Sequence, residues 1–185
     1  MVNSSLLKLG TAILLAASQA TGTVVPLQTQ DCFATETPAQ FCYTAKNGAT
    51  PQDVDLADIS FVASYLRSYG RQTRLGRLFT MNSVDTQNCA EWTLYTHGSV
   101  MATAKHIDPS LNSSVLFEDI ANTIDGGEKA TDAQKAKALL GCGTDGGAVG
   151  VIVNSTAAAY HTTAYTTGNF STSGLIVKIV WSGAS

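Results

Sequence analysis

The run Leu175–Trp181 reads LIVKIVW, and it decides the fold that we expect for this chain. Apart from Lys178, the run is apolar on both of the faces that a strand would present. That pattern is typical of a strand that lies inside a sheet and is covered on both sides. A run of this length is too short to cross a bilayer core of roughly 30 Å. We therefore expect Leu175–Trp181 to be a central strand, and we expect no stable membrane insertion.

Three other segments also have the pattern of strands. Cys89–Ile107 alternates apolar and polar residues on both sides of a possible turn at His97–Ser99, which predicts a strand pair. Gly147–Val153 and Ala158–Thr166 are bounded by turn residues and are predicted to be strands as well. One face of the first strand of the pair is predicted to carry Trp92, Leu94 and Thr96.

Helices are predicted in three places. Thr50 as the N-cap and Pro51 at the first helical position indicate a helix that runs to about Tyr69 and stops before Gly70. A second helix is predicted to begin at Ser113 or Ser114 and to end at Gly126 and Gly127, with one apolar stripe. A third begins after Thr131 and ends at Leu140, before Gly141. The apolar stripe of the second helix consists of Leu116, Phe117, Ile120 and Ile124.

Strands and helices mix here without regular βαβ alternation. The fold class is therefore predicted to be α+β: a single domain with an antiparallel or mixed sheet, two to three helices packed on it and two disulfides. We expect residues 1–20 to be a signal peptide, residues 21–50 a disulfide-pinned N-terminal arm, and residues 51–185 the α+β domain. About 165 residues after the leader suit one domain with one core.

The N-terminal residues Met1–Ala20 have the three parts of a cleavable signal peptide. Lys8 supplies the positive charge, Leu9–Ala17 is a short apolar run, and Ser18–Ala20 places small residues at a cleavage site. A transmembrane anchor is the alternative, and the short apolar run disfavours it. We therefore expect a secreted, extracellular protein.

The composition of the chain is that of a folded protein. Hydrophobic residues make up 44% and charged residues 14%, and the formal net charge is −3. Nonspecific binding to nucleic acid depends on a strong positive field, so this balance argues against it. No cofactor is predicted.

Four cysteines lie in the mature part: Cys32, Cys42, Cys89 and Cys142. An even number after a signal peptide indicates two disulfides, with three possible pairings. We favour Cys32 with Cys42 and Cys89 with Cys142, because the first two are near neighbours; the crossed pairings remain open. A zinc site would need closely spaced Cys and His ligands, and the sequence has none.

Three glycosylation sequons follow the leader, at Asn112, Asn154 and Asn169. Sequons of this kind are glycosylated on surface segments of proteins in a eukaryotic secretory pathway. The sequence thus predicts a glycoprotein with three candidate sites.

The catalytic candidates are His97, His106 and Glu91. A hydrolase or ribonuclease needs a base and an acid within reach of a substrate proton, so these side chains would have to converge. His161 and Glu118 are also possible partners. The motifs GxSxG, HExxH and the EF-hand are absent, and no metal site is predicted. Gly141–Gly147 lacks the spacing of a phosphate loop and is predicted to be a helix cap, a disulfide and a turn.

Two surface features have alternative interpretations. Arg67, Arg71, Arg74 and Arg77 form a local basic cluster, which is either an anion or glycan contact or a solvated face. Several aromatic residues are either a sugar-binding face or part of the core. These are Trp92, Tyr95, Tyr160, Tyr165 and Trp181.

The sequences YTHGS at Tyr95–Ser99, LFEDIANTI at Leu116–Ile124 and GCG at Gly141–Gly143 follow one another in a familiar order. In this respect the chain resembles the necrosis-inducing extracellular effectors, within the small secreted effector and killer-toxin-like proteins of filamentous fungi. It departs from them at Val100, where a cysteine is expected. The resemblance covers about 50 residues and implies a secreted virulence protein, without known catalysis, that is directed at a host or a competitor.

Three functional hypotheses follow. The first is a secreted non-enzymatic effector or toxin-like protein that acts on an extracellular protein or glycan target of another organism. The second is a small extracellular enzyme, such as a ribonuclease, which needs a histidine and a carboxylate converging in a cleft. The third is a cell-wall or glycan-binding protein, which needs a row of solvent-facing aromatic rings.

Overall fold

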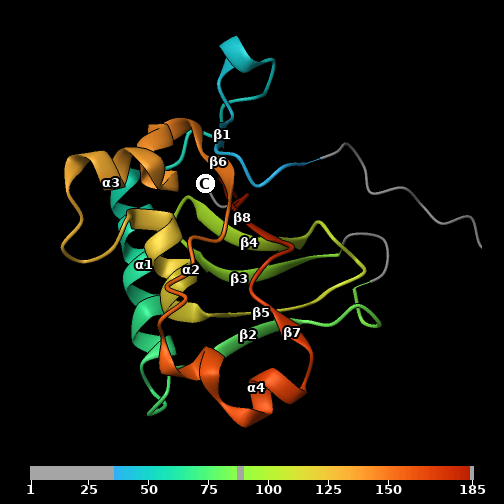
Figure 1. Cartoon of the computed structure of the whole chain (residues 1–185). Helices are drawn as coiled ribbons and strands as arrows, with labels where there is room; N and C mark the ends of the chain where they lie inside the picture. Colours follow the sequence, from blue (N-terminus) through green and yellow to red (C-terminus); the bar gives the residue numbers. More distant parts are fainter. Residues whose placement is uncertain (1–35, 87–89, 184–185) are drawn as a thin grey trace, which may run out of the picture.

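The computed structural model describes residues 36–86 and 90–183. Within these residues the chain forms four α-helices, three short 3-10 helices and eight strands in two sheets. Helices and strands mix along the chain, so the predicted α+β class is confirmed. Figure 1 shows α1, α2 and α3 gathered on one side of the larger sheet.

The larger sheet has five strands in the order β1-β6-β8-β4-β3, and every neighbouring pair is antiparallel. β8 lies between β6 and β4, so the prediction of a central strand at Leu175–Trp181 is confirmed. The strand pair predicted within Cys89–Ile107 is also confirmed, as β3 and β4. The strands of this sheet are β1 Phe41–Cys42, β6 Gly147–Gly150, β8 Leu175–Trp181, β4 Val100–His106 and β3 Glu91–His97.

The smaller sheet has the order β2-β5-β7. β2 (Leu78–Met81) pairs antiparallel with β5 (Asn112–Leu116), and β7 (Phe170–Ser171) pairs parallel with β5. Ser113 and Ser114, where a helix was predicted to begin, lie within β5 and are buried. That prediction was wrong because these serines pair with β2.

Helix α2 therefore begins only at Phe117 and extends to Asp125. Gly126 follows it in the left-handed conformation (φ 87°), which glycine adopts without steric cost. The predicted end of this helix is thus confirmed.

Helix α1 spans Leu56–Gly70 and begins five residues later than the sequence predicted. The side chain of Asp55 caps it by accepting a hydrogen bond from the backbone N of Ala57 at 2.7 Å. Asp53 has a φ of 54°, which is incompatible with a right-handed helix. The prediction of Thr50 as N-cap and Pro51 as first helical residue was therefore wrong.

The chain after α2 is more helical than predicted. Thr131 caps α3 (Asp132–Lys137) as expected. The predicted end at Leu140 was wrong, because Ala138 is extended and separates α3 from a 3-10 helix over Leu139–Asp145. The strand predicted at 158–166 is wrong: this segment forms a 3-10 helix and α4, because the Thr162 side chain caps the latter by accepting from the backbone N of Tyr165. The remaining bounds are Ala45–Asn47 for a first 3-10 helix, Ala158–His161 for the third, and Thr163–Thr167 for α4.

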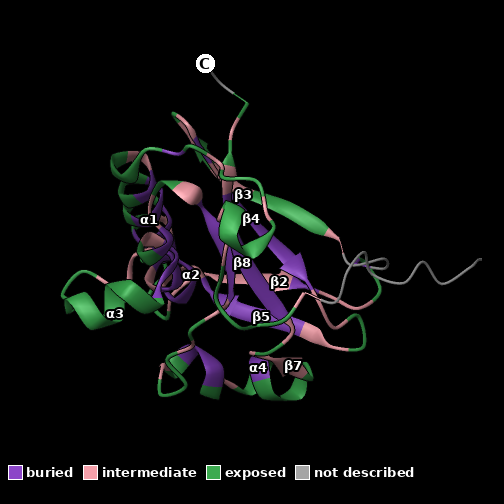
Figure 2. Ribbon diagram, turned by 90° about the horizontal axis from the view of Figure 1, so that it is seen from above, coloured by how far each residue is buried: buried purple, intermediate pink, exposed green. Residues whose placement is uncertain are grey.

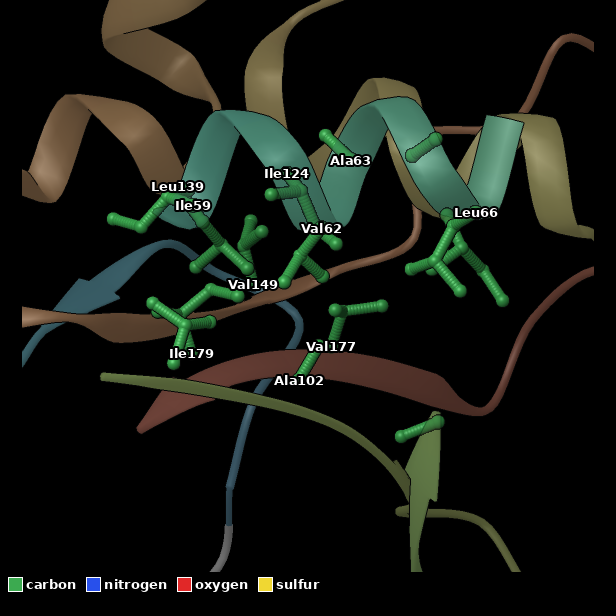
Figure 3. Packing of buried hydrophobic residues seen from close by; sticks show 14 of the residues in the cluster. Ile59, Val62, Ala63, Leu66, Ala102, Ile124, Leu139, Val149, Val177 and Ile179 are labelled. Carbon is green, nitrogen blue, oxygen red and sulfur yellow. The ribbon is translucent and has the colours of Figure 1, made fainter. Parts of the chain in front are cut away.

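The main core lies between the larger sheet and the helices α1 and α2. Figure 3 shows Ile59 and Val62 of α1 above Val177 and Ile179 of β8. These residues are fully buried, and Figure 2 shows α1, α2, β4 and β8 turning buried surface toward one another. Burying an aliphatic side chain contributes roughly 1.5–3 kcal/mol, so this layer stabilises the position of α1 on the sheet.

A second, smaller cluster joins β5 to the segment that ends in α4. At its centre, the Tyr160 hydroxyl donates to Asp119 at 2.6 Å and accepts from the backbone N of Leu116 at 2.7 Å. Tyr165 packs edge-on against Tyr160 and donates its hydroxyl hydrogen to the carbonyl of Ser114 at 2.7 Å. Both tyrosines are therefore structural.

The described disulfide joins Cys42 to Cys142, residues 100 apart in sequence. β1 pairs with β6 so that Cys42 lies opposite Gly147, which brings it next to the 3-10 helix that holds Cys142. The favoured pairings of Cys32 with Cys42 and of Cys89 with Cys142 were therefore wrong. Cys32 and Cys89, like the predicted leader, lie outside the described residues.

Across 36–86 and 90–183, no helix combines the length and the apolar composition that a membrane span requires.

Candidate binding surface

A row of aromatic side chains runs along α1 and the edge strand β3. Three of its rings come from α1 and recur every four residues: Phe61, Tyr65 and Tyr69. Residues at this spacing lie on one face of a helix. We call the whole row the aromatic strip, and it comprises Phe61, Tyr65, Tyr69, Phe79, Trp92, Tyr95, His97 and Phe117.

Two stacked pairs connect α1 to β3 within the strip. The Phe61 ring stacks on His97 with centroids 3.8 Å apart, and Tyr65 stacks on Tyr95 at 3.7 Å. Stacked aromatic pairs contribute about 0.5–1.5 kcal/mol beyond the area that they bury. Because each partner lies on a different element, the stacking fixes the rings relative to one another.

The other end of the strip is built from edge-to-face contacts. Tyr69 meets Phe117 of α2 at 4.9 Å, and Phe79 of β2 contacts both Phe117 and Trp92. The guanidinium of Arg77 lies 4.0 Å from the centre of the Tyr69 ring and donates to its hydroxyl at 2.7 Å. This end therefore combines aromatic surface with a fixed positive charge.

Three rings of the strip are exposed, and its other members are half-buried. Phe61 retains 45% of its surface, Tyr65 41% and Trp92 37%. Single exposed apolar residues are ordinary, but contiguous apolar patches mark interaction sites. Tyr, Trp, Phe and Arg are also the residues enriched where proteins bind their partners. The strip is the described surface that best fits a binding role.

A β-bulge determines which residues of β3 join the strip. The pairing of β3 with β4 shifts between Thr93 and Tyr95. Trp92, Tyr95 and His97 lie opposite core residues of β4 and so share the face of α1. The prediction that Trp92, Leu94 and Thr96 share one face was therefore wrong for Thr96, which lies opposite Met101, whereas Leu94 packs against the same core as Tyr95.

His97 also meets a carboxylate, but a different one from Glu91. Its Nε2 lies 3.7 Å from Oδ1 of Asp58, while Oδ2 of Asp58 accepts from both the backbone N and the hydroxyl of Ser99 at 2.8 Å. These two bonds lower the pKa of Asp58. Ser99 in turn accepts from the backbone N of Asp55. A pocket of about 450 Å³ lies beside Ser99, lined by Asp53, Val54, Asp55, Leu56, Ser99 and Thr144.

This arrangement differs from that of a nucleophilic serine. In such a site the histidine accepts the proton of the serine, and the carboxylate lies behind the histidine. Here the carboxylate of Asp58 stands between Ser99 and His97, and the Ser99 hydroxyl donates to it. The geometry therefore supports a structural role for Asp58 in holding the β3–β4 turn.

His106 is fully buried and has no carboxylate partner among the described hydrogen bonds. Its Nε2 lies 2.9 Å from the Ser113 hydroxyl, which itself donates to the carbonyl of Ser173. Its Nδ1 lies 2.5 Å from Thr86 Oγ1, and the Thr86 hydroxyl donates to the carbonyl of Asn82. His106 joins the two sheets and faces no cleft.

Glu91 lies on the opposite face of the sheet from His97. It accepts from the Thr103 hydroxyl at 2.6 Å and from Lys178 at 3.0 Å. The bulge in β3 separates Glu91 from His97, so the fold does not bring these two candidates together. The other candidates are also engaged, His161 with the carbonyl of Ser155 and Glu118 with Arg71.

The four predicted basic residues do not form one patch. Arg67 is buried in an ion pair with Asp125 at 2.6 Å, and Arg71 pairs with two glutamates of the α2 region. Arg77 donates a hydrogen bond to the Tyr69 hydroxyl and lies over the Tyr69 ring. These three charges stabilise packing around α1, which argues against a shared anion site.

The aromatic residues singled out from the sequence divide into three groups. Trp92 and Tyr95 belong to the aromatic strip. Tyr160 and Tyr165 are core residues of the smaller cluster. Trp181 is exposed at the end of β8. Phe61 and Tyr65 were missed, although their spacing of four with Tyr69 is a signal that the sequence contains.

Two of the three sequon asparagines are exposed, Asn154 and Asn169. The third, Asn112, is half-buried at the start of β5, and its amide oxygen accepts from the backbone N and the hydroxyl of Ser83 at 3.0 and 3.1 Å.

Among residues 36–86 and 90–183, no three His, Cys, Asp or Glu side chains gather as metal ligands would. Comparisons with family models, with curated proteins and with solved structures found no match.

Proposed function

We propose that the chain is a secreted, non-enzymatic effector or toxin-like protein that binds a target of another organism through the aromatic strip. The observation that carries this proposal is the exposure of rigidly stacked rings on an edge strand and its neighbouring helix. Aromatic side chains offer a large contact area at low entropic cost, and stacking reduces that cost further. The target is an extracellular protein or glycan.

The test applies the purified protein to plant tissue and to competing microbes, and compares the wild type with Phe61→Ser/Tyr65→Ser. Hot-spot aromatics contribute about 2 kcal/mol or more each, so we expect the variant to lose activity at least about tenfold. Tissue death and microbial growth are the readouts. A matched control is Val84→Ser/Ile152→Ser, which removes two exposed apolar side chains outside the strip.

Three outcomes contradict the proposal. The first is a wild-type protein without effect in both assays, and the second is a strip variant with full activity. The third is an equal loss of activity in the control variant, because that result would indicate a general effect of surface polarity. Far-UV circular dichroism of each variant verifies that it has folded.

A small extracellular enzyme is the second candidate, because His97 and Asp58 are close together near a pocket. An enzyme that uses this pair would degrade RNA in the wild type and lose that activity in His97→Ala. RNA degradation that survives in Phe61→Ser/Tyr65→Ser but disappears in His97→Ala would favour the enzyme over the binding protein.

A further inference from the structure

The face of the larger sheet opposite α1 carries two buried lysines, Lys105 of β4 and Lys178 of β8. In the register of these strands Lys178 lies opposite Thr103, so the two lysines are diagonal neighbours on one face. The two side chains are only 11% and 10% exposed, respectively. Like charges at such positions repel one another, and burial makes each more costly. An anion must therefore accompany them.

Glu91 of β3 supplies one carboxylate, 3.0 Å from the Lys178 Nζ, and Glu36 supplies a second from outside the sheet. The Oε1 of Glu36 lies 2.7 Å from the Lys178 Nζ, and its Oε2 contacts the Nζ of Lys105. Burial by itself raises the pKa of Glu36, but the two lysines outweigh burial and hold it below its usual value. One carboxylate thus bridges two ammonium groups, with one oxygen on each.

The segment that carries Glu36 is held to the sheet separately. The backbone N of Gly150 donates to the carbonyl of Pro38 at 2.9 Å, and β1 begins only at Phe41. Residues 38–42 can therefore remain in place when the Glu36 side chain turns away. Glu36 and Glu91 are both partly exposed, so the carboxylates that pair with the lysines lie at the solvent boundary on this side.

We propose that Lys105 and Lys178 form an oxyanion-binding site, which Glu36 occupies in this structure and which takes the phosphate or carboxylate group of a ligand in its place. This site is separate from the aromatic strip and does not depend on the function proposed for it.

The test uses Glu36→Gln in the full chain, because glutamine keeps the shape of the side chain and removes its charge. Inorganic phosphate and acetate are titrated separately by calorimetry, with chloride holding the ionic strength constant. We expect the variant to bind at least one anion about tenfold or more tighter than the wild type, in which Glu36 competes. The two titrations show whether phosphate or carboxylate is preferred.

Two controls make the result specific. Glu36→Gln/Lys178→Met should lose the gained affinity, since one of the two cations is gone. Glu128→Gln removes the same charge from a partner of Arg71 and should bind like the wild type. Equal binding in wild type and Glu36→Gln, binding that survives Lys178→Met, or a similar gain in Glu128→Gln overturns the proposal.

If Glu36→Gln is too unstable for calorimetry, its folding in different salts tests the proposal instead. If Glu36→Gln folds in phosphate or acetate but not in chloride of the same ionic strength, the anion has replaced the carboxylate and the proposal is supported. If it stays unfolded in all three salts, the proposal fails.

Discussion

His106 shows how one buried side chain makes the fold sensitive to pH. Burial lowers its pKa from the usual value of 6.5. When the pH falls below the pKa of an unfolded histidine, the unfolded chain binds a proton at His106 more readily than the folded protein does. The contribution of His106 to stability is therefore complete above this pKa and is lost as the pH decreases. The slope for one group approaches about 1.4 kcal/mol per pH unit.

Urea unfolding between about pH 7.5 and 5 tests this prediction, with the titration window set by the histidine reference pKa. The wild type should lose stability on acidification, and His106→Gln should be less stable at neutral pH but show a flatter profile. His97 and His161 are present in both proteins, so their contributions cancel. Parallel pH profiles in the two proteins would show that His106 is not the cause.

For single residues, the sequence predicts the roles that depend on partners close by in the chain. Thr131 was found as a cap because its partner Gln134 is three residues away, and Gly126 because it follows an apolar stripe. The role of Asp58 could not be predicted, since its partner Ser99 lies 41 residues away.

The turn that joins β3 to β4 requires glycine at position 98. Gly98 has a φ of 50°, and a Cβ there would lie 2.2 Å from Oδ2 of Asp58. Gly98→Ala should therefore be less stable by about 2 kcal/mol or more, of which about 1–2 is the left-handed backbone alone. Thermal or urea unfolding measures the loss.

Gly48→Ala is the matched control, because Gly48 also has a positive φ but has nothing within 4 Å of its would-be Cβ. It should show only the smaller backbone cost. If Gly98→Ala is no more destabilising than Gly48→Ala, the contact with Asp58 does not constrain the turn.

Elements with a strong local pattern were predicted, and those that depend on distant partners were not. β8 is apolar throughout, so its central place could be inferred from composition. The segment 158–166 alternates like a strand, yet its two tyrosines are drawn into a helical turn by contacts with Asp119 and Ser114. The aromatic strip needed both α1 and the bulge in β3, and no single segment reveals it.

At the scale of the molecule, the disulfide between Cys42 and Cys142 closes a large loop. Cross-linking residues this far apart restricts the unfolded chain, so Cys42→Ser/Cys142→Ser should lose roughly 2–5 kcal/mol of stability. Unfolding in urea without reductant measures the loss.

Peptide mapping without reduction should identify the Cys42–Cys142 pair, which leaves Cys32 and Cys89 as the pair for a second disulfide. A cross-linked peptide that joins Cys32 to Cys42 would contradict this arrangement.

The exposed sequons lie on segments that contribute no residue to the aromatic strip. Asn154 precedes the third 3-10 helix, and Asn169 lies between α4 and β7. We expect glycans at these two sites and none at Asn112, whose amide is bonded to Ser83. Intact mass after expression in a glycosylating host should fall by one glycan in Asn154→Gln and in Asn169→Gln. An equal fall in Asn112→Gln would contradict this prediction.

The position of β8 has a consequence for the order of synthesis. Both of its neighbours in the sheet, β4 and β6, precede it along the chain, so they are made before the strand that joins them. Until Leu175–Trp181 is synthesised, β3 with β4 and β1 with β6 are separate pairs with no shared sheet. The core between the larger sheet and α1 therefore cannot close before Leu175–Trp181 has been made.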